Sequence, residues 1–221
     1  MKKILVVSPH PDDETLGCGG TLLKLKKQNY KIDWLIITSM SEDLFNSKSR
    51  LKRNNEIKKV KKMYNFNNIF NLNFPTMKLD QIPLREIIGK VSKVIKISRP
   101  NTIFTNFYGD VHSDHKIVFD VISSCTKNFR CPYVSKIFLY ETLSETGYYL
   151  GNKNQVFIPN YFTDITKLMT KKIKIMNIYS SELMKGYMPR SIRGIKTLAE
   201  YRGLFINVKY AEAFMLVYEK D

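Results

Sequence analysis

The stretch that decides the fold runs from residue 4 to residue 20 and reads ILVVSPHPDDETLGCGG. Its first four residues form an apolar run of strand length, and a helical pattern of leucines begins at Leu16. Between them lies a turn with one imidazole and three consecutive carboxylates. A strand, a tight turn and a helix start form the first unit of a doubly wound α/β fold, in which ligands bind beyond the carboxyl ends of the strands.

The side chains of this turn are suited to hold a cation. Pro9 and Pro11 stiffen the backbone around His10, and crowding three acids into one turn is unfavourable unless a positive charge offsets their repulsion. An imidazole and a carboxylate are ordinary ligands of zinc, and a catalytic zinc takes three protein ligands and a water. The alternative is an acidic turn in which Asp12 or Asp13 only caps the next helix. A metal site needs a third ligand from elsewhere in the chain.

A second turn supplies that ligand. The other two histidines, His112 and His115, follow a buried strand predicted over residues 102–107, and Asp114 between them is placed to cap the next helix. All three histidines of the chain therefore come directly after predicted strands, in acid-rich turns. The carboxyl ends of parallel strands meet at one edge of a sheet, so the sequence predicts that these two turns share a metal.

The remaining pattern predicts an α/β chain with a mostly parallel, Rossmann-like sheet flanked by helices. Neither a linker nor an internal repeat interrupts it, so a single domain over residues 1–221 is expected. Beyond the opening unit, strands are predicted over 31–38, 68–74, 102–107, 136–141, 155–158, 162–165 and 211–218, and helices over 49–64, 83–98, from 114 onward and over 166–184. Residues 186–203 are predicted to form a loop and short helix that can close over a cleft.

The helix predicted over residues 49–64 is strongly basic. Most of its lysines lie off the buried stripe and are expected to face solvent, as are Lys171, Lys172 and Lys174 of the later helix. Arg53 differs because it begins the buried stripe. Two interpretations stay open for it: an ion pair with Glu56 that supports the helix, or an arginine that holds an anionic or hydroxyl-rich ligand.

The composition is that of an ordinary globular protein, with 43% hydrophobic and 25% charged residues. Without a signal-peptide pattern or an apolar run of about 20 residues, a cytoplasmic protein with no transmembrane segment is expected. Three cysteines, an odd number, fit reduced thiols. The net charge of +16 suits a phosphorylated or nucleotide-linked small molecule. Because no nucleic-acid-binding signature accompanies the charge, nucleic acid is not an expected partner.

The two histidine turns together resemble the motifs of a known family. The run HPDDETLGCGGT from His10 resembles the first motif of the LmbE-like deacetylases, also called the PIG-L family, and His112-Ser113-Asp114-His115 resembles their His-x-Asp-His motif. The run YAEAF from Tyr210 is similar to the end of these proteins. The resemblance implies a Rossmann-like fold, a divalent metal and removal of an N-acetyl group, typically from glucosamine. Members often form homo-oligomers.

The resemblance also implies roles for individual residues. The metal ligands would be His10, Asp13 and His115, holding Zn²⁺, although Fe²⁺ or another divalent metal accepts the same donors. Asp12 would be the general base that activates a water molecule.

The resemblance further implies that His112 stabilises the oxyanion or protonates the leaving amine, with Asp114 orienting it. Arg53 resembles a substrate-binding arginine of the family. Glu14 would support His10 or the turn, or would simply be an acid in the first turn of a helix. The side chains of Tyr108, Asp110, Tyr148 and Tyr149 are placed to line the cleft or to pack beside it.

Two other functions remain open from the sequence. One is a nucleotide-binding Rossmann-like protein that uses Gly17, Gly19 and Gly20 as a phosphate loop, although their spacing is not that of the dinucleotide fingerprint. The other is a metal- or glycan-binding module without catalysis. The favoured function is a zinc-dependent hydrolase that deacetylates an amino sugar.

Overall fold

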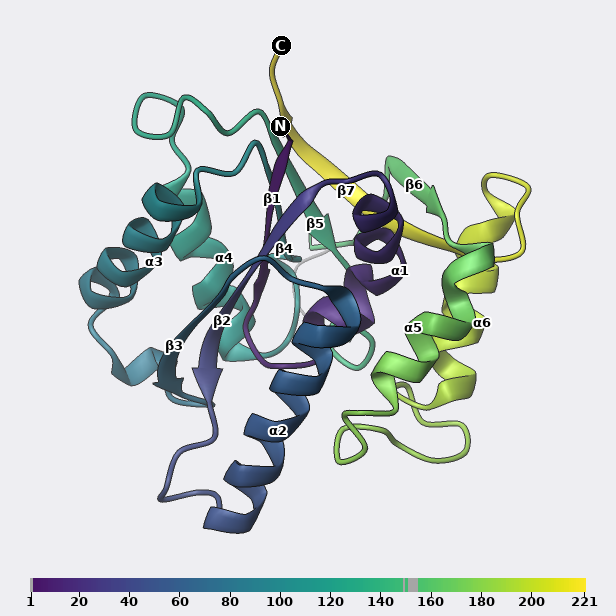
Figure 1. Cartoon of the computed structure of the whole chain (residues 1–221), viewed down its shortest axis with the longest axis horizontal. Coiled ribbons are helices and arrows are strands. Elements are labelled where there is room, and N and C mark those ends of the chain that lie inside the picture. The colour runs from purple at the N-terminus through teal and green to yellow at the C-terminus, as the bar shows by residue number, and fades with distance from the viewer. Residues whose placement is uncertain (1, 149, 151–154) are drawn as a thin grey trace.

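Seven strands form a single sheet in the order β3-β2-β1-β4-β5-β7-β6, in which the first five pair in parallel and β7 pairs antiparallel with both β5 and β6 (Figure 1). The computed structural model describes residues 2–148, 150 and 155–221. The strands are β1 (Lys3–Ser8), β2 (Lys31–Ser39), β3 (Ile69–Pro75), β4 (Thr102–Asn106), β5 (Lys136–Tyr140), β6 (Tyr161–Asp164) and β7 (Ala211–Glu219). The predicted α/β class with a mostly parallel sheet is confirmed.

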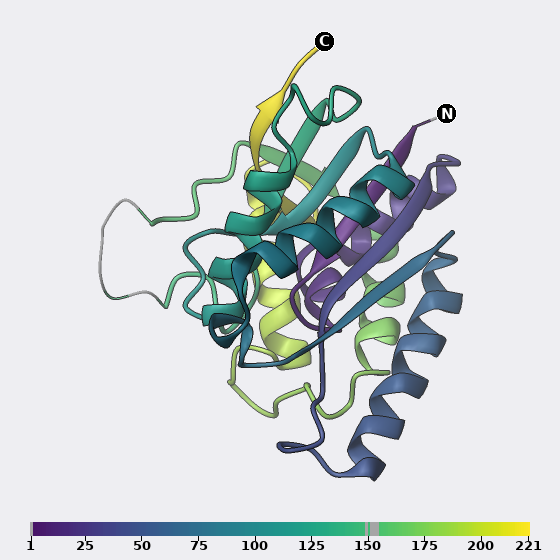
Figure 2. The same ribbon diagram turned by 90° about the vertical axis from the view of Figure 1, so that its left-hand side faces the viewer.

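Helices cover both faces of this sheet, as the side view shows (Figure 2). Buried residues of α1 (Asp13–Lys27), α2 (Ser47–Tyr64), α5 (Met169–Met176) and α6 (Ile192–Leu204) belong to one core cluster, which also contains Ile4, Val6 and Trp34. Those of α3 (Leu84–Ser98) and α4 (Ser113–Cys125) belong to the other, together with Leu5 and Val7. The side chains of β1 thus alternate between two buried layers, which explains its unbroken apolar run.

Part of the C-terminal half differs from the prediction. Residues 155–158 form no strand, and the exposed side chains of Val156 and Ile158 show that an apolar run alone does not supply a pairing partner. The helix predicted over 166–184 is shorter, with a 3-10 turn over Thr166–Leu168 before α5 and an end at Met176. The buried ring of Tyr179, which extended the apolar pattern, packs from a turn instead.

The expectation that Lys172 faces solvent is wrong, because its side chain is buried. Its ammonium group donates to the carbonyl of Leu16 at 2.8 Å and to the carboxylate of Glu212 at 2.7 Å. Glu212 in turn accepts from the backbone N–H groups of Gly20 and Thr21. This buried pair satisfies backbone groups on both sides of the non-helical residue Cys18, where α1 is kinked.

The glycines after the first turn are buried in packing contacts. A Cβ atom at Gly17 would lie 2.1 Å from the ring of Tyr140, and one at Gly20 would lie 2.6 Å from Ile165. These glycines let α1 approach its neighbours closely. They are therefore not exposed to a phosphate group, which removes the main support for a nucleotide-binding loop at this place.

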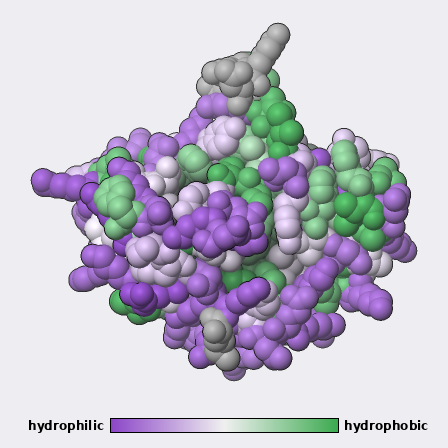
Figure 3. Space-filling model, turned by 90° about the horizontal axis from the view of Figure 1, so that it is seen from above, coloured by the Kyte–Doolittle hydropathy of each residue, from purple (hydrophilic) through white to green (hydrophobic). Residues whose placement is uncertain are grey.

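The surface at the end of the molecule where β1 begins is mostly hydrophilic, with apolar patches between the hydrophilic residues (Figure 3). Within residues 2–148, 150 and 155–221, no helix combines the length and the hydropathy that crossing a bilayer requires.

Candidate metal centre and active site

The two histidine-containing turns meet where the strand order reverses. β1 pairs with β2 on one side and with β4 on the other, and the turns after β1 and β4 begin at adjacent positions on the same edge. Such a switch point leaves a crevice between helices that run off in different directions, and open α/β sheets bind ligands there. The topology thus brings His10 into ring contact with His112 and His115, at centroid distances of 4.6 and 5.3 Å.

Three side chains converge in this crevice. One carboxylate oxygen of Asp13 lies 3.5 Å from Nδ1 of His10 and 3.4 Å from Nε2 of His115. A ligand atom from each residue lies within 4.8 Å of the other two. The sequence predicted these three residues as metal ligands, and the structure places them together.

In His10 and His115, the ring nitrogen that faces away from Asp13 lies beside a second carboxylate. Nδ1 of His115 is 2.8 Å from Asp110, and Nε2 of His10 is 3.0 Å from Asp114. Metal-binding histidines commonly have such a partner, which fixes the tautomer and the direction of the ring. The sequence suggested only that Asp110 lines the cleft or packs beside it, whereas its carboxylate lies against the imidazole of His115. Its place five residues before His115 in the same turn was the only indication of this contact in the sequence.

Asp114 differs from expectation in two respects. Its carboxylate contacts His10 and the N–H groups of Met77 and Leu79, so it does not orient the ring of His112. Nor does its side chain cap α4: the N-cap is His112, whose Nδ1 accepts from the backbone N–H of Asp114 at 3.1 Å. Asp114 thus orients His112 through its N–H group alone.

The electrostatics of the cluster favour a bound positive charge. Burial alone would lower the pKa of His10, but hydrogen bonds to Asp114 and Asp13 outweigh it and raise the pKa to about 9. The pKa of His115 is also raised in spite of burial, by Asp13 and Asp110. Burial would raise the pKa of Asp13, but the two imidazoles lower it well below its usual range. In the metal-free protein, protons supply the charge that balances these carboxylates.

The donor set fits a divalent cation. Two imidazole nitrogens and one carboxylate oxygen face one another, each imidazole is supported by a carboxylate, and all three groups come from short turns fixed by β1 and β4. Two nitrogens and one oxygen form the usual three-ligand set of a catalytic zinc site, and iron(II) or cobalt accepts the same donors.

Cation binding is expected to release protons, so its apparent affinity should rise with pH. Below pH 9, His10 is protonated in the metal-free protein, and the cation must displace that proton. The apparent association constant should increase by up to about tenfold per pH unit for each proton released. Titration calorimetry with zinc between pH 6.5 and 8, in buffers of different ionisation enthalpy, measures the number of protons. An affinity that is the same at both pH values would contradict this linkage.

Asp12 lies beside the cluster in a strained conformation. Its φ of 134° is in a region that side chains disfavour, at a cost of about 1–3 kcal/mol. It lines the cleft, and its Oδ2 is buried without a hydrogen-bond partner among the described residues. Burial, and then the charges of Asp13 and Glu182, raise the pKa of Asp12 well above its usual value. Asp12 precedes the helix as its N-cap, but its side chain makes no capping hydrogen bond.

His112 faces the same cleft as a neutral ring. Burial, and then the charges of His10 and His115, lower its pKa to about 4. Because Nδ1 accepts from the backbone of Asp114, the neutral ring carries its proton on Nε2, where it can be donated to a ligand.

The cleft around these groups has a volume of about 290 Å³. Its wall includes Arg53, Glu145, Glu182 and Arg190, besides residues of the turns. Arg53 shows features of both earlier interpretations: its Nε lies 3.2 Å from Glu56, and it also borders the cleft. Its guanidinium donates to the carbonyl of Pro11 at 2.7 Å and pairs with Glu182. Arg53 therefore also supports the turn that carries Asp12.

Two residues at the wall of the cleft, Glu182 and Glu145, had no role predicted from the sequence. Glu182 and Arg190 come from the segment between α5 and α6, and Glu145 follows β5. Arg190 lies in the loop that was expected to close over a cleft, although the helix after it is longer than predicted. Glu182 lies near the end of the basic helix predicted over 166–184 and Glu145 in a segment without periodicity, so nothing in the sequence distinguished them from other surface acids.

The remaining candidates have supporting or peripheral positions. Glu14 is fully buried and accepts hydrogen bonds from Thr15, Tyr179 and the N–H of Asp12, and burial raises its pKa to about 7. Glu14 thus supports the turn, as one interpretation of the sequence predicted. Among the residues proposed to line the cleft, Tyr108 packs against Phe107 and Phe119, Tyr148 is half exposed, and Tyr149 lies outside the described residues.

Comparison with known proteins adds a family match. A family model described as GlcNAc-PI de-N-acetylase, or PIG-L, matches residues 5–126, more than half of the chain and a range that includes both histidine turns. A diacetylchitobiose deacetylase from Thermococcus kodakarensis is 25% identical over 98% of this chain and 84% of its own length.

Solved structures share the fold. A conserved protein from Thermus thermophilus superimposes with a TM-score of 0.80 at 24% identity, over all of this chain and 97% of that one. The 4-carboxy-2-hydroxymuconate hydratase GalB from Pseudomonas putida gives a TM-score of 0.78 at 16% identity, over all of this chain and 98% of that one. A hydratase on this fold means that the fold alone does not define the reaction.

Proposed function

The chain belongs to the PIG-L family, and on that premise we propose that it is a metal-dependent hydrolase that removes the N-acetyl group from an N-acetylated amino sugar or its conjugate. The observation that carries the proposal is the convergence of His10, Asp13 and His115 in a cleft that Asp12 also lines. The deacetylase from Thermococcus kodakarensis, which matches nearly the whole chain, supports the same reaction class.

Hydrolysis of an amide needs an activated water, a base and stabilisation of the negative charge that develops on the carbonyl oxygen. A divalent cation held by His10, Asp13 and His115 would lower the pKa of a water molecule and polarise the carbonyl. Asp12 would be the base that accepts a proton from the attacking water molecule. Its pKa is raised by burial and by the charge of Asp13, which makes the carboxylate a stronger proton acceptor.

His112 acts opposite the base. With its pKa near 4 it is neutral at pH 7, and its Nε2–H is a hydrogen-bond donor. This state suits stabilisation of the oxyanion better than direct protonation of the amine, for which an imidazolium would be required. The proton that Asp12 accepts is then available for the leaving amine.

Arg53 and Glu182 form a charged pair at the wall of the cleft and can recognise sugar hydroxyl groups. A preference for a phosphorylated sugar in the cleft itself has little support. Glu182 already pairs with Arg53 and lies 3.9 Å from Arg190, and Asp12 and Glu145 add negative charge. The cleft therefore suits a neutral amino-sugar ring.

The direct test is release of acetate by the purified protein. After loading with zinc or iron(II), we expect equimolar acetate and free amine from di-N-acetylchitobiose or N-acetylglucosamine, and no release after chelation of the metal. The acetate assay distinguishes this hydrolase from a hydratase, which releases none. It also distinguishes it from a binding module, which would retain the sugar without turnover. Absence of acetate from every N-acetylated sugar, in protein that has bound metal, would overturn the proposal.

A further inference from the structure

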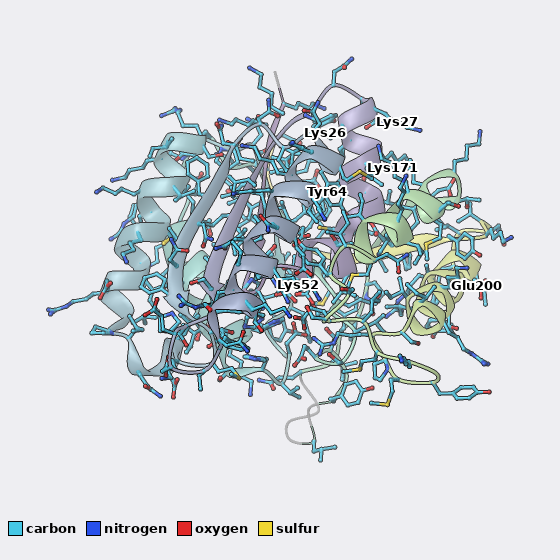
Figure 4. All side chains as sticks on the ribbon, turned by 60° about the horizontal axis from the view of Figure 1, so that its bottom comes forward. Lys26, Lys27, Lys52, Tyr64, Lys171 and Glu200 are labelled. Carbon is cyan, nitrogen blue, oxygen red and sulfur yellow. The ribbon has the colours of Figure 1, made fainter. Side chains whose placement is uncertain are left out.

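Much of the excess positive charge lies outside the cleft, on one face of the molecule. This face comprises α2, α5 and the end of α1, and Figure 4 labels Lys52, Lys171, Lys26 and Lys27 on it. Within α2 the only acidic residue is Glu56, which is buried, and α5 contains no acid. The basic face therefore has little internal neutralisation.

The basic face is hollowed along the line where α2 and α5 run past each other. The hollow nearer the cleft has a volume of about 680 Å³, and its lining includes Lys48, Lys52, Lys59 and Lys174 together with asparagine and serine side chains. A second hollow of about 200 Å³ lies at the opposite ends of the two helices, beside Lys26, Lys27 and Lys171. We call these two hollows together the basic seam.

The length of the basic seam indicates an extended ligand. Lys48, Lys52 and Lys59 lie on one stripe of α2 and span about 16 Å along the helix axis. A single phosphate or carboxylate contacts only one end of such a stripe. A chain with anionic groups at intervals can contact all of it.

The basic seam also lies next to the cleft. Glu56 lines the seam and pairs with Arg53, which lines the cleft. On the other wall, Ser180 lines the seam, and the next residue, Ser181, accepts a hydrogen bond from Arg53. One layer of side chains therefore separates the two hollows.

We propose that the substrate is a unit of an anionic glycan: an N-acetylated sugar enters the cleft while flanking acidic units of the same chain lie along the basic seam. This inference rests on the proposed deacetylase function. Lysine ammonium groups bind the acidic groups, and the asparagine and serine side chains of the seam are hydrogen-bonding partners for hydroxyl groups. The surplus charge of the chain then recognises its substrate from outside the cleft.

Two other polyanions fit this surface less well. A membrane surface calls for several exposed apolar anchors beside the lysines, and among the described residues that line the seam Leu51 is the one exposed large hydrophobic side chain. A single-stranded nucleic acid calls for aromatic rings on which bases stack. Tyr64, the one aromatic residue among the described lining, is buried.

The test compares two triple variants that change net charge equally. Lys48, Lys59 and Lys174, all exposed and in the seam, are replaced by glutamine, and the control replaces Lys90, Lys93 and Lys96 on α3, which covers the other face of the sheet. The probe is a fluorescent hyaluronan octasaccharide, in which N-acetylglucosamine alternates with glucuronate. We expect the seam variant to bind it about tenfold more weakly and the control to bind as the parent does.

Acetate release supplies the second readout. The ratio of kcat/KM for hyaluronan to kcat/KM for di-N-acetylchitobiose should fall about tenfold in the seam variant and stay unchanged in the control. Equal losses in both variants, no binding by the parent protein, or tighter seam-dependent binding to anionic vesicles or to RNA would overturn the inference. If hyaluronan binds through the seam but metal-loaded protein releases acetate from no sugar, the proposed function fails while the polyanion site stands.

Discussion

Replacement of Asp12 by asparagine is expected to lower kcat for acetate release by about 10²- to 10⁴-fold while the bound metal stays near one ion per chain. Asparagine keeps the shape of the side chain but cannot take a proton from water. The metal should remain because the converging donors belong to His10, Asp13 and His115. Elemental analysis and steady-state kinetics on the same preparation measure both quantities.

The structure indicates that this substitution changes little besides the proton-accepting group. The carboxylate of Asp12 is buried, has an oxygen without a partner among the described residues, and lies close enough to Asp13 to raise its pKa. Asparagine removes that repulsion and has nearly the same size and shape, so Tm should not fall. A variant with kcat within threefold of the parent would exclude Asp12 as the base, and loss of metal would show a ligand role instead.

The sequence was enough to predict the outline of the fold and the convergence of the two turns. The apolar runs of β1 and β4 mark strands buried on both faces, and each is followed at once by histidine and aspartate. In a parallel sheet, such turns lie on the same edge. Three rare imidazoles that all occupy this edge could therefore be grouped without coordinates.

The partners inside the site could not be predicted in the same way. Sequence proximity assigned Asp114 to its neighbour His112, but the folded chain places its carboxylate on His10, 104 residues away. Lys172 resembled other lysines of a basic helix, and only the approach of β7 with Glu212 makes its burial favourable. Each case depends on which side chain faces which across elements distant in the chain, and local periodicity does not carry that information.

The net charge of the chain likewise did not predict where the charged side chains lie. The net charge of +16 suggested an anionic substrate, yet the cleft contains Arg53 and Arg190 among Asp12, Glu145 and Glu182. Composition reports how much charge a chain carries, whereas the helices decide which face presents it. Here α2 presents Lys48, Lys52 and Lys59 along the basic seam, and α5 presents Lys171 and Lys174, while Lys172 of α5 is buried.

The second large effect is expected at the metal ligands. Replacing His115 by alanine should lower the affinity for zinc by at least about 100-fold and lower Tm of the zinc-loaded protein toward that of the metal-free form. His115 contributes the one donor in the set that does not come from the first turn. Without it, His10 and Asp13 remain as two ligands from one turn, which is too few for a closed catalytic site.

Asp110 to asparagine is the matched comparison for this experiment. Asp110 contacts Nδ1 of His115 at 2.8 Å and is not one of the three converging donors, so its loss should weaken zinc binding by about 10- to 100-fold, less than loss of the ligand. Zinc affinities are measured by competition with a chromophoric chelator at fixed pH, because binding is coupled to proton release. Zinc affinities that fall in the order parent, Asp110 variant, His115 variant are expected if the turns after β1 and β4 share a single ion. Equal zinc affinity in all three proteins would mean that zinc binds somewhere else, and the hydrolytic mechanism would lose its basis.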